Sequence, residues 1–226
     1  MNSLKIFSSS TEKESLGHKF RRKRFSFLFE NLEALCKEKE KNNTLPVKIL
    51  DVGGLQSYWE NMGMDNNPNL DITLVNLAAE GAKFKNISSI VGDATNLQNI
   101  KDNEYDVAFS NSVIEHLYSF ENQRKMSEEV KRVGRYHFIQ TPNRFFFLEP
   151  HYLLPFVQFL PKQTLFSLLT KTKISRGHKW DKDYAKQYID EIRLLTLKEM
   201  KILFPESKIY KEKFLGMLKS FTAHNF

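Results

Sequence analysis

The sequence predicts an α/β fold in which a mostly parallel, seven-stranded sheet is covered by helices on both faces. Short apolar runs, typical of buried strands, alternate along the chain with segments of helical periodicity. Glycine, asparagine and proline gather between these segments, where turns are expected. With 226 residues, of which 41% are hydrophobic and 27% charged, the chain has the size and composition of one globular domain.

The first 45 residues are predicted to form a basic helical segment ahead of a main domain that spans residues 46–226. The spacing of Phe25, Leu28, Leu32 and Leu35 favours a helix over 15–39. Its early part carries five basic residues, namely Lys19, Arg21, Arg22, Lys23 and Arg24. A solvated helix face is the simplest interpretation of this cluster, and a phosphate-binding surface is the alternative.

Four strands are predicted in the first half of the main domain. They are residues 47–52, 71–76, 87–91 and 105–110, and a short helix over 55–62 follows the first of them. Strands that alternate with helices in this way favour parallel pairing with right-handed crossovers.

A helix over 121–133 and a fifth strand over 136–140 are predicted next. The helix has Glu121 early and Lys131 and Arg132 late, which suits its dipole, and Gly134 follows as its stop. Both elements continue the alternation.

The alternation breaks after the fifth strand. Residues 144–195 begin with a stretch rich in aromatic residues and are predicted to form a helical, lid-like insertion packed over the edge of the sheet. Thr196 and Glu199 then form a capping-box pattern that begins a short helix. Residues 208–215 and 217–223, separated by Gly216, are predicted to be antiparallel strands that complete the sheet of seven.

Each of the first four strands ends in residues suited to contact a ligand. In open α/β sheets ligands bind beyond the carboxyl ends of the strands, where the strand order reverses. We therefore expect a binding site formed by Asp51, Gly53, Gly54, Asn76, Asp93, Ala94, Ser110 and Asn111. Any one of these residues is weak evidence, since a glycine pair is often only a turn, but their order along four strands favours a site.

Four segments resemble the cofactor motifs of class I S-adenosylmethionine (SAM)-dependent methyltransferases, in particular those of Rossmann-like, type 11-like architecture. They are ILDVGGLQSYW, ITLVNL, VGDATNL and YDVAFSNSVIEHL, and SNSVIEHL is the most similar piece. The resemblance is strong over about residues 45–140 and loose over 196–226. It implies SAM as cofactor, with Asp51 toward its ammonium group, Asn76 at the ribose, Asp93 near the adenine amine, and Ser110 and Asn111 beside the sulfonium.

Two departures from the family pattern affect individual residues. Leu55 and Ser57 stand at the later positions of the usual glycine-rich loop, and Asn76 replaces the acidic residue that ends the second strand. An asparagine still bonds ribose, although more weakly than a carboxylate does. A nicotinamide cofactor is disfavoured, because the glycine spacing that cradles a pyrophosphate is missing.

The expected chemistry is methyl transfer to a hydroxyl or similar polar group. Such a transfer needs alignment and removal of a proton, and His116 and His151 are the candidate bases. Substrate contacts are expected from Glu115, Asn143 and Glu149. Some related methyltransferases carry Glu-x-x-Glu-His here and bind a divalent metal. Ser112 occupies the first position, so one carboxylate is missing and no metal is expected; the alternative is that Glu149 or His151 replaces it.

The expected acceptor is a small molecule, such as a saccharide or a biosynthetic intermediate. The alternatives are a methyltransferase of RNA or protein, and a SAM-binding protein without catalysis. A net charge of +7 favours an anionic partner, yet no RNA-binding module is evident. The aromatic insertion leaves open a membrane-surface contact or a homodimer.

A cytoplasmic location is expected. The single cysteine, Cys36, cannot form an internal disulfide. The start of the chain lacks the pattern of a secretory signal, and the longest apolar stretch, 152–160, is too short to span a bilayer.

Overall fold

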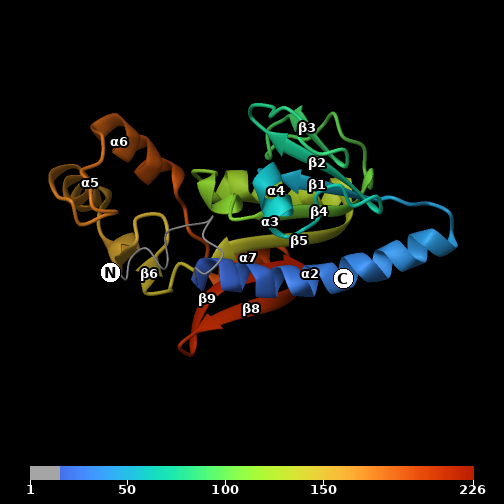
Figure 1. The fold of residues 1–226 in the computed structure, drawn as a ribbon. Helices are drawn as coiled ribbons and strands as arrows, with labels where there is room; N and C mark the ends of the chain where they lie inside the picture. The colour runs from blue at the N-terminus through green and yellow to red at the C-terminus, as the bar shows by residue number, and fades with distance from the viewer. Residues whose placement is uncertain (1–15) are drawn as a thin grey trace.

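Seven strands form one sheet in the order β3–β2–β1–β4–β5–β9–β8 in the computed structural model, which describes residues 16–226 (Figure 1). The strands are β1 (Val47–Val52), β2 (Leu70–Asn76), β3 (Ile87–Val91), β4 (Tyr105–Asn111), β5 (Gly134–Pro142), β8 (Lys208–Phe214) and β9 (Met217–His224). The first five pair in parallel, whereas β9 pairs antiparallel with both β5 and β8. The predicted seven-stranded α/β fold is confirmed.

The strand order reverses at β1. From β1 the chain moves to one side through β2 and β3, and then returns to the other side of β1 for β4 and β5. Leu50 and Asp51 of β1 pair with Ala108 and Phe109 of β4. The carboxyl ends of these two central strands therefore meet at the switch point, where the chain segments that follow them diverge.

One face of the sheet is covered by α2 (Leu16–Lys41) and α3 (Gln56–Asn61). The four apolar residues that predicted α2 are all buried, and Leu28 and Leu32 are each only 1% exposed. They pack with Ile49, Ile72 and Val107 of the central strands. The basic helix is thus part of the main hydrophobic core, and Figure 1 shows it running along the sheet.

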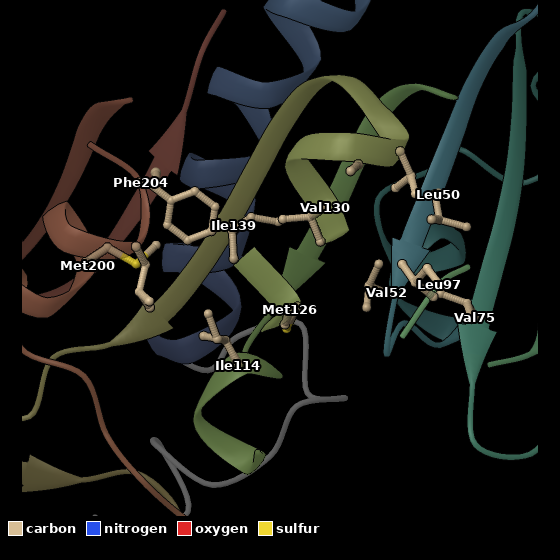
Figure 2. Packing of buried hydrophobic residues seen from close by; sticks show 14 of the residues in the cluster. Leu50, Val52, Val75, Leu97, Ile114, Met126, Val130, Ile139, Met200 and Phe204 are labelled. Atoms are coloured by element: carbon tan, nitrogen blue, oxygen red, sulfur yellow. The ribbon is translucent and has the colours of Figure 1, made fainter. Parts of the chain in front are cut away.

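The opposite face is covered by α4 (Phe120–Val133) and α7 (Leu197–Leu203), with the short 3₁₀ helix η1 (Ile114–His116) below them. Figure 2 shows Met126 and Val130 of α4 packed between Ile139 of β5 and the central strands. Met200 and Phe204 close the same cluster from the far side. The capping box predicted for the start of α7 is present, since Thr196 and Glu199 exchange both of its hydrogen bonds.

Gly134 ends α4, as predicted, but for a different reason from the one expected. Its φ is −111°, so it does not adopt the left-handed conformation of a typical helix stop. A Cβ atom at this position would lie 2.7 Å from the backbone nitrogen of Ala108 in the neighbouring strand. The glycine is therefore required by the close approach of β5 to β4.

Residues 144–195, called the lid segment below, form a small unit with its own core. It contains β6 (Leu148–Glu149), β7 (Leu154–Pro155), η2 (Val157–Phe159), α5 (Lys162–Lys171) and α6 (Lys182–Glu191). Tyr152, Leu169 and Trp180 are buried against one another and against α6. Figure 1 shows α5 and α6 beside the end of the sheet. The core of the lid segment is thus largely internal, while Phe146 also contacts Phe214 of the edge strand β8.

Part of the aromatic content of the lid segment stays on its surface. Phe145, Phe156 and Phe159 are between about half and two thirds exposed, and Phe145 stacks on Phe159. Within residues 16–226, no helix combines the length and the apolar character needed to cross a bilayer.

Replacement of Leu28 by alanine should destabilise the whole protein. Leu28 is 1% exposed in the core beneath the sheet, and a Leu→Ala change in such a site costs roughly 2–5 kcal/mol of unfolding free energy. Glu30→Ala, on the exposed side of the same helix, should change it by less than about 0.5 kcal/mol. Urea unfolding compares the two variants. If Leu28→Ala lowered the unfolding free energy as little as Glu30→Ala does, α2 would not be part of the cooperative core.

Candidate functional site

The loop after β1 depends on two glycines. Gly53 has a φ of +76°, and a Cβ atom there would lie 2.6 Å from the Val113 side chain. A Cβ atom on Gly54 would collide with the Asp51 carboxylate, at 1.9 Å from its Oδ2 atom. Each glycine is therefore needed for the internal packing of the loop, whether or not a ligand is bound.

Asp51 places a carboxylate at the switch point. Trp59 of α3 donates its Nε1–H to Oδ2 over 2.8 Å. The other oxygen, Oδ1, is buried and has no hydrogen-bond partner among the described residues. Burial raises the pKa of Asp51 to about 7, although the Trp59 hydrogen bond lowers it in part. An unpartnered acceptor of this kind is suited to a positively charged ligand group.

A cavity of about 260 Å³ opens beside this loop. We call it the strand-end cavity. Its wall includes four of the predicted cofactor residues: Asp51, Gly53, Gly54 and Asn111. The other lining residues are Arg21, Leu55, Ser57, Tyr58, Asn61, Met62, Phe109, Ser112 and Val113. A cavity thus lies at the strand ends where the strand order reverses, and binding of the cofactor there stays a prediction.

The remaining predicted cofactor residues lie outside this wall. Asn76 donates its Nδ2–H to the Gly54 carbonyl over 2.8 Å and so fastens the glycine loop. The Ser110 hydroxyl is fully buried and donates to the Val52 carbonyl over 2.9 Å, which links β4 to β1. Asp93 accepts from the backbone and hydroxyl of Thr95, and Ala94 packs against the core. Contacts of these four residues with a cofactor stay predictions.

A second cavity, of about 160 Å³, adjoins the first and shares Arg21, Asn111 and Ser112 with it. We call it the basic cavity. It is also lined by Gly17, Phe20, Arg24, Gln140, Pro142, Asn143, Phe146, Leu148, Pro150, Leu153, Lys219 and Ser220. Asn143, predicted to contact substrate, is among them; its side chain bonds the Leu218 carbonyl and the Phe145 amide.

The charges of the basic cavity are positive. Arg24 is 4% exposed and donates to Glu212 over 2.6 Å and to Asn111 over 2.7 Å. Lys219 of β9 lies 4.2 Å from the centre of the Phe20 ring, and burial lowers its pKa to about 8. Arg21 completes the set. No carboxylate appears among the described residues that line this cavity.

A third group of polar residues lies where the lid segment meets the sheet. Glu115, His116 and His151, called the histidine cluster below, place their ligand-forming atoms within 4.8 Å of one another. The two imidazole rings are 4.9 Å apart, centre to centre. Neither histidine lines the strand-end cavity or the basic cavity.

Carboxylates fix both imidazoles. His116 Nδ1 lies 2.6 Å from Glu191, and His151 Nδ1 lies 2.6 Å from Glu149. Burial lowers the pKa of His151, but the hydrogen bond and charge of Glu149 outweigh it, so that the pKa is raised. Burial raises the pKa of Glu115, and the two neighbouring imidazoles lower it in part.

Glu115 and Glu149, which were predicted to contact substrate, form hydrogen bonds within the protein. Glu115 Oε2 accepts the Thr141 hydroxyl over 2.9 Å. Glu149 is 1% exposed and bonds the His151 ring and the Tyr152 amide. Direct contact of either carboxylate with a substrate stays a prediction.

Arg21 and Lys219 are two of the charged lining residues that were not predicted as site residues. Arg21 belongs to the basic cluster, whose role the sequence left open between a solvated face and a phosphate-binding surface. Lys219 enters the cavity because β9 pairs with β5, which aligns Ser220 with Pro142. The charge cluster could have indicated Arg21, whereas no local pattern marks Lys219.

Asp51 should make stability depend on pH. Its folded pKa of about 7 exceeds the ordinary value of 3.8, so the folded state holds the proton more tightly between these values. Stability contributed by the protonated group is therefore lost as pH rises from about 4 to about 7. Asp51→Asn keeps an acceptor for Trp59 but does not titrate. Its unfolding free energy relative to wild type should rise over this range; a constant difference would contradict the assignment.

The comparisons with known proteins agree with this geometry. A family model described as a methyltransferase domain matches residues 50–136, a range that includes the glycine loop and the histidine of η1. No curated protein matches the sequence.

Three solved structures are similar to this chain. A SAM-dependent methyltransferase from Methanosarcina mazei is 12% identical, with a TM-score of 0.49, over 79% of this chain and 91% of the other. A Rhodobacter sphaeroides protein, provisionally named a Zn-dependent alcohol dehydrogenase, is 10% identical, with a TM-score of 0.50, over 80% and 84%. A Bordetella parapertussis protein, provisionally named as exported, is 12% identical, with a TM-score of 0.50, over 86% and 67%.

At these identities, the two structures with a TM-score of 0.50 show a shared fold and nothing of function. The activity is indicated by the family model, whose range includes Asp51 and the glycine loop of the strand-end cavity. Residues 50–136 form a methyltransferase domain of the S-adenosylmethionine-dependent class, and S-adenosylmethionine is its cofactor.

Proposed function

We propose that the protein transfers the methyl group of SAM to a hydroxyl or similar polar group of a small molecule that carries an anionic group. The observation that supports this most is the basic cavity. It shares Arg21, Asn111 and Ser112 with the strand-end cavity. An acceptor in one cavity is thus adjacent to a cofactor in the other, as in-line methyl transfer requires.

The charges of the basic cavity favour an anionic acceptor. Arg21, Arg24 and Lys219 bring three basic side chains together, and Glu212 forms an ion pair with Arg24. A guanidinium binds carboxylate or phosphate oxygens with two parallel hydrogen bonds. The apolar residues Phe20, Phe146 and Leu153 of the same wall suit the uncharged part of such a molecule.

The size of the basic cavity favours a small acceptor. Its volume of about 160 Å³ suits a compact polar molecule or a single sugar-sized group. Recognition of RNA ordinarily uses exposed aromatic platforms beside basic groups, whereas Phe20 and Phe146 of this cavity pack against other side chains. RNA or protein as acceptor, and cofactor binding without catalysis, are the alternatives.

The protein's main contribution to the reaction is alignment. The sulfonium cofactor supplies the reactivity, while fixed placement of the two reactants contributes up to roughly 7–11 kcal/mol in favourable cases. Asp51 has an unpartnered buried oxygen in the wall of the strand-end cavity, which supports a contact with the ammonium group of the cofactor. Asn111 and Ser112 line both cavities, which supports a position for them at the point of transfer.

His116 and His151 stay candidate bases for removal of the acceptor proton. A base acts at hydrogen-bond distance, directly or through one water. Pro150 lines the basic cavity and His151 follows it in the chain, so a water-mediated path through this part of the wall is the arrangement we propose. The Nδ1 contacts with Glu191 and Glu149 leave each Nε2 atom available.

Transfer of a radiolabelled methyl group separates the proposed acceptor from its alternatives. The protein is given labelled SAM with a metabolite extract, with total RNA or with a protein extract. We expect label in small anionic metabolites that an anion-exchange column retains. Label in RNA alone or in protein alone would overturn the proposal, and no label with any acceptor would favour binding without catalysis.

Replacement of Lys219 by methionine should weaken binding of the acceptor. Hydrogen bonds to charged groups contribute about 1.5–3 kcal/mol, so we expect KM for the acceptor to rise by roughly 10–100-fold. The affinity for SAM should not change. Because the Lys219 pKa is about 8, the wild-type KM should also rise as pH increases through that value, while the KM of the variant should lack this step.

The matched control is Lys213→Met, which removes an exposed lysine from the neighbouring strand β8. It makes the same change in net charge away from the cavity. Equal effects of the two substitutions on KM would contradict a local role for Lys219.

A further inference from the structure

We propose that Glu115, His116 and His151 form a binding site for one divalent transition-metal ion, with Zn²⁺ as the best-suited candidate. The ion would bind the Nε2 atoms of both imidazoles and the Oε1 atom of the carboxylate. The site stands on the arrangement of these side chains and does not rest on the proposed acceptor. It also reverses the expectation from the sequence, in which Ser112 left the motif one carboxylate short.

The three residues are already gathered around one point. Their ligand-forming atoms lie within 4.8 Å of one another. Around a tetrahedral ion with bonds of about 2.1 Å, neighbouring ligand atoms are about 3.4 Å apart. Ligand atoms 4.8 Å apart would need to move by roughly 1 Å to reach that spacing, which is within the range of small side-chain shifts.

Both imidazoles have the orientation typical of metal ligands. A ligating histidine almost always gives its other ring nitrogen to a carboxylate or carbonyl, which fixes the tautomer and makes the ligating nitrogen more basic. Here Glu191 and Glu149 each lie 2.6 Å from an Nδ1 atom. The proton is thereby directed to Nδ1 in each ring, and Nε2 keeps its lone pair.

Glu115 supplies the observation that is hardest to explain without a cation. It is 0% exposed, and its Oε2 atom accepts the Thr141 hydroxyl. Its Oε1 atom is buried and has no hydrogen-bond partner among the described residues. A buried, unpartnered carboxylate oxygen is costly, and a metal ion bound between it and the two imidazoles removes that cost.

The donor set selects the class of metal. Two imidazoles and one carboxylate suit Zn²⁺ and its first-row neighbours, whereas Mg²⁺ prefers oxygen ligands and keeps most of its water. Three protein ligands leave a position open for water or for an oxygen of the acceptor, as in zinc sites that take part in catalysis.

The ion would connect two parts of the fold. Glu115 and His116 belong to η1, which follows β4 of the sheet, while His151 and both supporting carboxylates belong to the lid segment. The backbone contact between Arg193 and Glu115, at 2.7 Å, lies at the same junction. Metal binding should therefore stabilise the lid segment against the sheet, beside the wall of the basic cavity that contains Pro150.

Calorimetry on the full chain, after treatment with a chelator, tests the site without any need for turnover. We expect one Zn²⁺ per chain with submicromolar affinity, weak or undetectable Mg²⁺ binding, and a higher melting temperature in the presence of Zn²⁺. Glu115→Gln and His151→Gln should each lower the Zn²⁺ affinity by at least about 10–100-fold, the range found when metal-site partners are removed. The control, His178→Gln, removes an exposed histidine of the lid segment and should bind Zn²⁺ as the wild type does.

NMR of the imidazole nitrogens tests the same site in the unmodified protein, so that a variant that fails to fold does not decide the question. Zn²⁺ should shift the Nε2 resonances of His116 and His151 and leave that of His178 in place. The absence of stoichiometric Zn²⁺ binding, Zn²⁺ shifts at other histidines, or unchanged affinity in both folded variants would overturn the proposal.

Activity before and after chelation then separates the metal from the base. Activity that disappears on chelation and returns with Zn²⁺ supports the metal site, because an imidazole bound through Nε2 cannot accept a proton there. If the protein binds Zn²⁺ and keeps full activity after the metal is removed, the ion has a purely structural role. If the protein never binds Zn²⁺ and is fully active, the metal site is overturned and the histidine base is retained. Neither result alters the assignment of the acceptor cavity.

Discussion

The reversal of strand order at β1 is the constraint on which the rest of the molecule depends. Because β2 and β4 lie on opposite sides of β1, the segments that leave β1 and β4 must diverge, and the gap between them is the strand-end cavity. The Ser110 hydroxyl, bonded to the Val52 carbonyl, holds the two strand ends at a fixed separation. The glycine loop folds back over this point, and its conformation is fixed by Val113 and Asp51. The site is therefore a consequence of topology first and of individual side chains second.

Elements from both ends of the chain complete the site. Arg24 of α2 bonds Glu212 of β8 and Asn111 of β4, and Glu212 also accepts the Ser220 hydroxyl of β9. Buried ion pairs often contribute little to stability, since desolvation offsets the attraction between the charges. This one joins four elements at a single point, which places the cations of the basic cavity beside the strand ends. The Arg24–Glu212 ion pair thus matters more for positioning these elements than for the stability of the protein.

Much of the fold could be predicted from the sequence because periodicity is a local property. The spacing of Phe25 and Leu28 predicted α2, and the apolar run over residues 47–52 predicted the first strand. Asp51 and Gly53 could be selected as candidates because they stand at the end of that strand. Asn76 and Asp93 lie at the predicted strand ends too, but their side chains bond the protein itself, and no sequence pattern separates that role from a ligand contact.

What the sequence could not reveal is how distant segments converge. Lys219 reaches the basic cavity through the pairing of β9 with β5, and no local pattern sets that register. His116 and His151 were each predicted as a base, yet their rings meet only because the lid segment folds back onto η1. The carboxylates that orient them, Glu191 and Glu149, come from the lid segment itself. The chemistry of the cluster is a property of that junction.

Hydrogen–deuterium exchange with and without S-adenosylhomocysteine, the demethylated product of the cofactor, tests most directly where the cofactor binds. The account predicts slower exchange in peptides that cover the glycine loop after β1 and the turn after β4, which together line the strand-end cavity, with smaller changes in α5 and α6. Protection confined to the lid segment or to the far ends of the strands, with the glycine loop unaffected, would contradict it.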